Sequence, residues 1–224
     1  AVAGAVWFPY KAGPPVKVGA WALHTRRWLE QLANTTPEAG IDVLTGYEIT
    51  RDDSWPWWAD GVSEITRAPA PVAGAPIAWK FTAPRAQPSL FLPWLTSRLK
   101  AQVERHTVTD LAAEPGDVVI NCTGLAAREL AHDHAMYPLL GQLVLADIGG
   151  ADLTASITDD RDPDSLFYII PRRDELVLGG CSLPIPPGTK PEIDAQIKQR
   201  IVQHAARLGL RIGDVRGERV GLRP

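Results

Sequence analysis

The stretch from residue 117 to residue 124 constrains the fold of this chain more than any other segment. It reads Asp-Val-Val-Ile-Asn-Cys-Thr-Gly, so three β-branched residues are followed at once by polar residues and a glycine. Such a short apolar run is typical of a strand buried on both faces of a parallel sheet. A glycine at the carboxyl end of a parallel strand lets a bound molecule approach the backbone closely. We therefore expect the last strand of a dinucleotide-binding sheet here, followed by a helix over residues 125–131.

The strand that opens such a sheet carries a glycine-rich turn, and no GxGxxG motif occurs in the 224 residues. The sequence also has no CxxC, HExxH or GxxxxGK motif and no Ser-His-Asp signature. His132, Asp133 and His134 are poorly spaced for metal ligands on one helix face, and no third ligand is evident. We expect an exposed polar turn there.

The composition argues against two classes of partner. Lys and Arg total 23 and Asp and Glu total 26, a net charge of -3, and no run of basic residues suits a nucleic-acid surface. No apolar stretch approaches the roughly 18 residues that span a membrane. Cys122 and Cys181 both fall in expected strands, where reduced core cysteines are commoner than a disulfide.

Two patterns of secondary structure alternate along the chain. Helix–strand units surround residues 89–131, whereas antiparallel strands with polar turns fill residues 41–82 and 142–222. Because the patterns alternate, any two domains must be interleaved, and we expect a mixed α/β (α+β) fold. The expected helices cover residues 18–33, 89–103 and 191–208, and the expected strands cover residues 41–49, 77–82, 107–111, 142–146, 167–171, 176–179 and 215–222.

Two polar side chains stand at positions suited to binding a small anion. Tyr168 alternates with Ile169 in an expected strand, so its phenol faces either a cavity or the core. Arg223 follows an apolar strand, where it either holds a carboxylate through its guanidinium fork or is simply solvated. The residues alone leave both alternatives open.

Five short motifs occur in order along the whole chain. They are Val2-Ala3-Gly4-Ala5-Val6-Trp7-Phe8-Pro9-Tyr10, Asn121-Cys122-Thr123-Gly124, Gly141-Gln142, Tyr168-Ile169-Ile170-Pro171 and Gly221-Leu222-Arg223-Pro224. Together they resemble the D-amino-acid oxidase family, FAD-dependent flavoenzymes of the glutathione-reductase type. Each motif is weak alone, and the resemblance depends on their common order and spacing.

The resemblance implies an oxidase that converts D-amino acids and O2 into 2-oxo acids, ammonia and H2O2, with hydride transfer from the substrate Cα to N5 of FAD. In the family pattern Arg223 holds the α-carboxylate and Tyr168 hydrogen-bonds it. Both residues therefore position the substrate, and none is expected to act as an acid or a base. Phe8 falls near the pocket, where an apolar side chain favours neutral substrates over D-aspartate.

The resemblance also assigns residues to the cofactor. The FAD-contacting positions of the family fall on Gly4, Ala5 and Trp7 beside the flavin, Val108 at the adenine end, and Thr123 and Gly124 at the strand end. On the same pattern, residues 1–10, 89–133 and 223–224 belong to a Rossmann-type FAD-binding domain. Residues 11–88 and 134–222 then form an antiparallel-sheet domain for substrate binding and subunit contact.

The expected assembly is a homodimer, because the antiparallel sheet and the exposed tryptophans of a loop at residues 55–58 favour an interface. Local packing of those tryptophans is the alternative. We expect a cytoplasmic protein, or a peroxisomal one in a eukaryote. Two other functions stay open: a glycine- or sarcosine-type amine oxidase on the same scaffold, and a non-catalytic remnant that serves as a binding module. The missing GxGxxG motif motivates the last of these.

Overall fold

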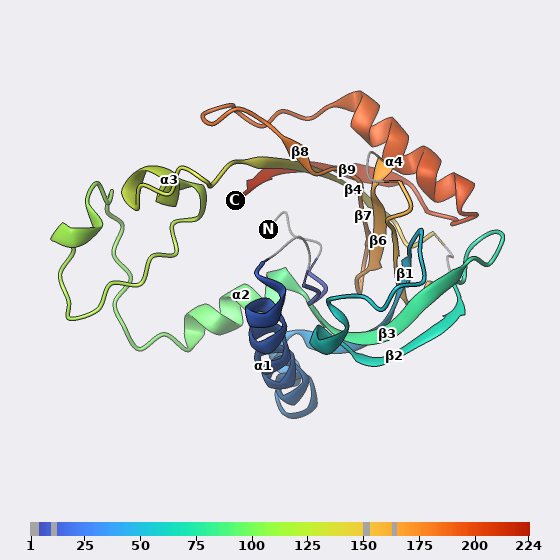
Figure 1. Cartoon of the computed structure of the whole chain (residues 1–224), viewed down its shortest axis with the longest axis horizontal. Helices are drawn as coiled ribbons and strands as arrows, with labels where there is room; N and C mark the ends of the chain where they lie inside the picture. The colour runs from blue at the N-terminus through green and yellow to red at the C-terminus, as the bar shows by residue number, and fades with distance from the viewer. Residues whose placement is uncertain (1–4, 10–12, 150–152, 163–164) are drawn as a thin grey trace.

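The computed structural model describes residues 5–9, 13–149, 153–162 and 165–224, and its strands join into one curved sheet (Figure 1). The strand order is β2-β3-β1-β5-β6-β7-β4-β8, with β9 paired to β4. Neighbouring strands are antiparallel except for β1 and β5, which are parallel. The strands are β1 (Ile41–Ile49), β2 (Ser63–Pro69), β3 (Ile77–Ala86), β4 (Leu139–Ala146), β5 (Ser156–Asp159), β6 (Phe167–Pro171), β7 (Leu176–Gly179), β8 (Leu183–Pro184) and β9 (Val215–Arg223).

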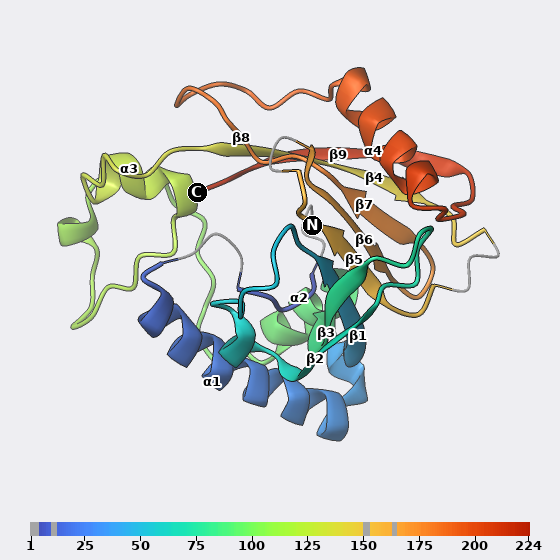
Figure 2. The same cartoon turned by 45° about the vertical axis from the view of Figure 1, so that its right-hand side comes forward.

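Four α-helices accompany the sheet within the described ranges. They are α1 (Pro15–Thr35), α2 (Pro88–Ser97), α3 (Ala127–Leu130) and α4 (Ala195–Arg207). Figures 1 and 2 both place α4 on one side of the sheet and α1 on the other. The mixed α/β class is confirmed, and the strand expected over residues 41–49 has the observed bounds. None of the described helices is both long enough and apolar enough to cross a membrane.

The strand expected over residues 117–120 is wrong. Residues 118–120 form no strand, and Val118 and Ile120 are 78% and 81% exposed. A strand needs a neighbour to take its backbone hydrogen bonds, and no strand of the described residues pairs with this segment. The segment between α2 and α3 instead forms an arc away from the sheet (Figure 1).

Two further expectations fail on this arc. The strand expected over residues 107–111 is absent, and a short 3-10 turn covers Leu111–Ala113. Cys122 is exposed rather than a core residue, whereas Cys181 is buried as expected. Both thiols are free, in line with the expectation of reduced cysteines.

The main core lies between the sheet and α4. Along β6, Phe167 and Ile169 are fully buried in the cluster that includes Ile197 and Ile201 of α4. Tyr168 belongs to a separate cluster on the opposite face of β6, as the two-residue period of a strand requires. The helix begins after Asp194, whose carboxylate accepts a hydrogen bond of 2.7 Å from the backbone N–H of Gln196.

Two buried polar contacts fix α4 to the sheet. The side-chain amide of Gln142 on β4 donates to the carbonyl of Asp194 and accepts from its N–H, each at 2.8 Å. At the other end of the helix, Nε2 of His204 lies 3.0 Å from Oδ2 of Asp159 on β5. Arg161 donates two further hydrogen bonds of 2.8 Å to the same carboxylate. The helix is therefore held to the sheet by side-chain hydrogen bonds at both ends, and Nδ1 of His204 is buried without a partner among the described residues.

The other half of the molecule packs through aromatic residues. Trp58 and Phe81 lie 5.2 Å apart between ring centroids, and Phe8 packs against both. The described N-terminal segment runs along β3, because the N–H of Trp7 donates to the carbonyl of Pro84 at 2.7 Å. The N–H of Ala86 donates back to the carbonyl of Ala5 at 2.8 Å, so the segment pairs with the end of β3 around an antiparallel bridge between Val6 and Arg85.

Removing a core side chain of α4 should destabilise the fold strongly. Ile201 is 1% exposed, so Ile201→Ala leaves a cavity and should cost about 2–5 kcal/mol of unfolding free energy, measured by urea denaturation. Ile193, which is 54% exposed, provides the matched control, and Ile193→Ala should cost less than about 0.5 kcal/mol. Equal losses in the two variants would contradict the core assigned here.

Asp159 should make stability depend on acid pH. Burial raises its pKa, but hydrogen bonds from Arg161 and His204 outweigh burial and hold the pKa well below the usual range. The charged form is thus favoured in the folded state, so its contribution is complete above the unfolded pKa of about 4 and is lost as the pH falls below it. Asp159→Asn should cost about 1–3 kcal/mol at pH 7. The unfolding free energy of the Asp159→Asn variant should then decline less between pH 5 and pH 3 than that of the parent protein. Equal declines in the two proteins would count against this hydrogen-bond network.

Candidate active site

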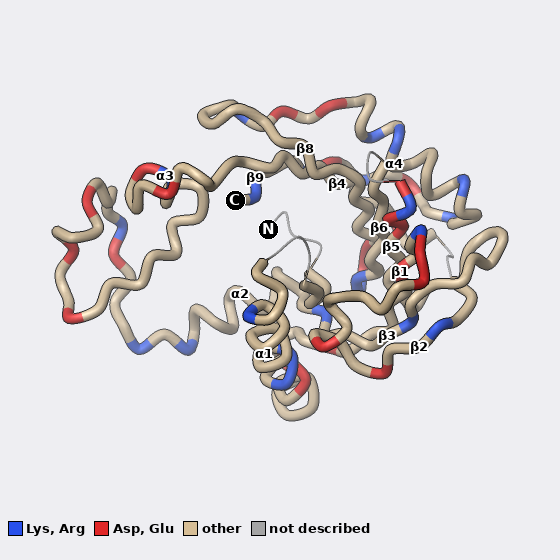
Figure 3. The backbone as a smooth tube through the Cα atoms, viewed as in Figure 1, with Lys and Arg blue, Asp and Glu red and all other residues tan. Residues whose placement is uncertain are grey.

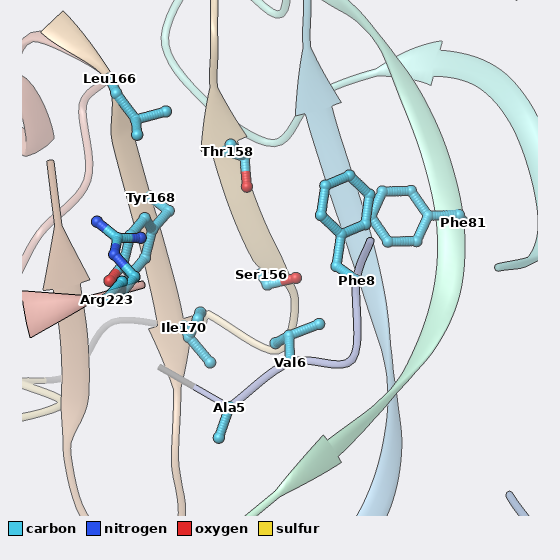
Figure 4. A pocket seen from close by; sticks show the side chains of 10 residues that line it. All are labelled: Ala5, Val6, Phe8, Phe81, Ser156, Thr158, Leu166, Tyr168, Ile170 and Arg223. Carbon is cyan, nitrogen blue, oxygen red and sulfur yellow. The ribbon is translucent and has the colours of Figure 1, made fainter. Parts of the chain in front are cut away.

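A cavity of about 180 Å³ opens between the N-terminal segment and the sheet face opposite α4. It is lined by Ala5, Val6, Phe8, Phe81, Ser156, Thr158, Leu166, Tyr168, Ile170 and Arg223 (Figure 4). Most of the lining is apolar, and one residue of the set, Arg223, carries a formal charge. Small-molecule sites commonly combine apolar walls with a few polar groups in this way.

Arg223 reaches the cavity because of the pairing between β9 and β4. Leu139 is the register partner of Arg223, and Gly141 lies beside the guanidinium, where a Cβ atom would come within 3.0 Å of Nη2. Nη2 donates a hydrogen bond of 2.7 Å to the carbonyl of Cys181, which fixes the fork. Nε is buried and donates to no described residue.

The charge of Arg223 is not neutralised within the described part of the chain. The ion pairs found there do not include Arg223. Elsewhere in the structure, charges of both signs are interspersed along the backbone (Figure 3). A partly buried guanidinium without a counter-ion is suited to bind an anion, and its planar fork matches a carboxylate.

Tyr168 lies beside Arg223 at the same end of the cavity (Figure 4). Its ring passes over Gly179 of β7, where a Cβ atom would lie 2.0 Å from Cζ of the ring, so the close contact requires glycine. Burial raises the pKa of Tyr168, and the nearby positive charge of Arg223 opposes that shift without cancelling it. The phenol therefore stays protonated at neutral pH and can donate a hydrogen bond.

The opposite end of the cavity is aromatic. Phe8 stacks on Phe81 with a centroid distance of 5.6 Å and an interplanar angle of 19°. Ala5 completes the wall near the N-terminus and has a φ of 72°, in the left-handed region. The structure thus brings four of the expected residues together around one cavity: Ala5, Phe8, Tyr168 and Arg223.

Other expected residues lie elsewhere. Nε1 of Trp7 donates to the carbonyl of Ala22 at 3.2 Å, so its indole packs against α1 instead of lining the cavity. Thr123 and Gly124 lie on the arc, as does Val108. The hydroxyl of Thr123 donates to Oδ1 of Asn121 at 2.7 Å. Their cofactor contacts stay predictions.

Gly124 has a φ of 59° and open space where a Cβ atom would be. Gly4 lies outside the described residues. Among the residues that the structure describes, no group of three His, Cys, Asp or Glu side chains is placed to hold a metal ion, and this includes the segment with His132 and His134.

Two pocket residues were missed by the sequence reasoning. Ser156 and Thr158 of β5 present their hydroxyls to the cavity, two positions apart on one face. The available signal was the alternation of these two residues with Ile157, but the strand is only four residues long, which is too short to show a clear period.

Comparisons with known proteins agree on one family. The model of the FAD dependent oxidoreductase family matches residues 2–224. D-amino-acid oxidases from Rubrobacter xylanophilus and Streptomyces coelicolor are 34% and 35% identical over the whole chain, which covers 71% of each of those proteins.

Solved structures show the same fold. Glycine oxidase from Geobacillus kaustophilus gives a TM-score of 0.71 at 15% identity, with 99% of this chain and 71% of that chain covered. Glycine oxidase from Bacillus cereus gives 0.66 at 18% identity, with 99% and 73% covered. The resemblance drawn from the five motifs is confirmed, and the chain belongs to the FAD-dependent oxidoreductase family that includes the D-amino-acid oxidases.

Proposed function

We propose that this chain carries the substrate site of an FAD-dependent D-amino-acid oxidase. One observation supports the proposal most directly: the guanidinium of Arg223 has no acidic partner among the described residues and lies beside the protonated phenol of Tyr168 in a mostly apolar cavity. The α-carboxylate of an amino acid carries the charge and the two oxygens that this pair can bind.

The geometry gives each residue a positioning role. The carboxylate accepts hydrogen bonds from the Arg223 fork and the Tyr168 hydroxyl, which fixes the orientation of Cα. The apolar walls, including Phe8 and Ile170, exclude water from the rest of the substrate. FAD would supply the acceptor for the hydride from Cα and would pass the electron pair to O2 as H2O2, and the imine left on the substrate would hydrolyse to a 2-oxo acid and ammonia.

The arc offers a surface that fits a cofactor of this kind. Val118, Val119 and Ile120 are exposed, and no hydrogen bond engages their backbone N–H and C=O groups within the described residues. Gly124 adds an open left-handed position at the end of the same segment. Apolar side chains with free backbone groups suit contact with a neighbouring strand or a bound dinucleotide. We therefore keep Val108, Thr123 and Gly124 as the residues that would contact FAD.

The cavity favours a substrate with a side chain over glycine. Beyond Arg223 and Tyr168, it extends to the stacked rings of Phe8 and Phe81, and glycine leaves that region empty. The relatives at 34% and 35% identity are named D-amino-acid oxidases, whereas the glycine oxidases are at most 18% identical. Glycine or sarcosine oxidation is thus the second candidate.

The first test is the activity itself. The purified protein with FAD should release H2O2 with D-alanine, more slowly with glycine or sarcosine, and not with L-alanine, in a peroxidase-coupled assay. Faster turnover of glycine or sarcosine than of any D-amino acid would favour the second candidate. A protein that holds FAD and oxidises none of these amines would refute both.

The second test addresses the carboxylate site. Arg223→Lys keeps the charge and loses the fork, so kcat/KM for D-alanine should fall about 10- to 100-fold, mainly through KM. Tyr168→Phe removes one hydrogen bond to a charged group and should cost about tenfold. Arg211 is exposed and away from the cavity, so Arg211→Lys is the matched control and should leave kcat/KM unchanged. Unchanged kinetics in Arg223→Lys would show that the carboxylate binds elsewhere.

A further inference from the structure

Ser156 and Thr158 form a pair of hydroxyls in the middle of the cavity. They are two residues apart on β5, so both side chains project from the face that carries Tyr168 and Ile170. Figure 4 shows them between the Arg223–Tyr168 end and the aromatic end formed by Phe8. The pair is therefore placed where the side chain of a substrate bound through its carboxylate would lie.

The two hydroxyls lack partners within the described chain. No hydrogen bond joins Oγ of Ser156 or Oγ1 of Thr158 to another described residue. Ser156 is 6% exposed and Thr158 is partly buried, and both residues line the mostly apolar cavity. A ligand that displaces water from the cavity can supply the hydrogen bonds that these hydroxyls then need.

The distance along the sheet suits a short side chain. Thr158 is the register partner of Tyr168 across β5 and β6, and such partners have Cβ atoms about 4.5–5.5 Å apart. A carboxylate held at Tyr168 therefore leaves space for one or two side-chain atoms before the Thr158 hydroxyl. Longer polar side chains would reach the apolar rings of Phe8 and Phe81 instead.

The surroundings favour a neutral side chain. Glu48 of β1 is the register partner of Thr158 but is buried and does not line the cavity. Burial, and then the neighbouring Asp160, raise the pKa of Glu48 well above its usual value. No carboxylate lines the cavity to bind a cationic side chain, and the lining groups of β5 are uncharged.

We infer that Ser156 and Thr158 hydrogen-bond the side chain of the substrate, so that short hydroxylated D-amino acids are preferred over apolar ones of the same shape. The inference rests on the proposed function, since it takes the carboxylate to lie at Arg223. It names the substrate class: D-serine and D-threonine, each with a hydroxyl one bond beyond Cβ. Both hydroxyls can donate and accept, which matches a substrate hydroxyl.

The test compares isosteric substrates. D-threonine and D-valine differ by a hydroxyl in place of a methyl group, as do D-serine and D-2-aminobutyrate. In the FAD-loaded protein, kcat/KM should favour the hydroxylated member of each pair about three- to tenfold. Thr158→Val and Ser156→Ala should reduce that ratio to near one, and Thr158→Ser should restore it.

A control variant and a binding measurement separate this role from general damage. Thr154 is exposed on the approach to β5, so Thr154→Val should keep the parent ratio. The unreactive acids 3-hydroxypropionate and butyrate form a second isosteric pair. Calorimetry should show tighter binding of 3-hydroxypropionate to the parent protein and equal binding of both to Thr158→Val.

The outcomes separate a failure of the hydroxyl subsite from a failure of the proposed function. The hydroxyl subsite alone would be overturned if the parent oxidises D-alanine but shows no preference for the hydroxylated substrate of each pair. It would also be overturned if the ratio of kcat/KM values within each pair stays unchanged in both Thr158→Val and Ser156→Ala. Failure to oxidise any D-amino acid would overturn the proposed function and the subsite with it.

Discussion

The pairing of β9 with β4 is the constraint on which the candidate site depends. Arg223 and Tyr168 are 55 positions apart in the sequence, and neither indicates a site alone. The register that sets Arg223 against Leu139 brings the guanidinium to the sheet face that carries Tyr168. A shift of one residue would turn Arg223 to the other face, because side chains alternate along a strand. In the observed register, Arg223 donates a hydrogen bond to the carbonyl of Cys181.

The two faces of the sheet have different roles: one packs against α4, and the other carries the candidate site. On one face, α4 covers an apolar core and is anchored by Gln142 and by the contact of His204 with Asp159. This packing fixes one face of β5, β6 and β7 against the helix. On the other face, the same strands present polar groups at alternate positions. A site built on strands that are fixed from behind holds its groups in place, which positioning of a substrate requires.

The sequence predicted the parts of the structure that local pattern decides. The strand over 41–49 and the helix built on Ile197 and Ile201 follow from periodicity, and β6 places Tyr168 and Ile169 on opposite faces as expected. The resemblance carried by the motifs around Tyr168 and Arg223 predicted that both residues belong to one substrate site, and both line the same cavity. Alternation alone did not show that the two side chains meet, because that depends on strand register.

The failures have physical causes as well. Residues 118–120 have the composition of a buried strand, but burial depends on neighbours, and the described chain gives them none. The indole of Trp7 is turned toward α1 by a hydrogen bond to Ala22, and the expected contact of Trp7 with the flavin stays a prediction. Ser156 and Thr158 were overlooked because four residues are too few to show a period.

The most direct measurement is a crystal structure of the FAD-loaded protein with 3-hydroxypropionate, which has no amino group to oxidise. The carboxylate oxygens should lie at about 3 Å from the Arg223 guanidinium and the Tyr168 hydroxyl. A carboxylate bound away from Arg223, or a ligand outside the cavity, would contradict the proposed substrate site.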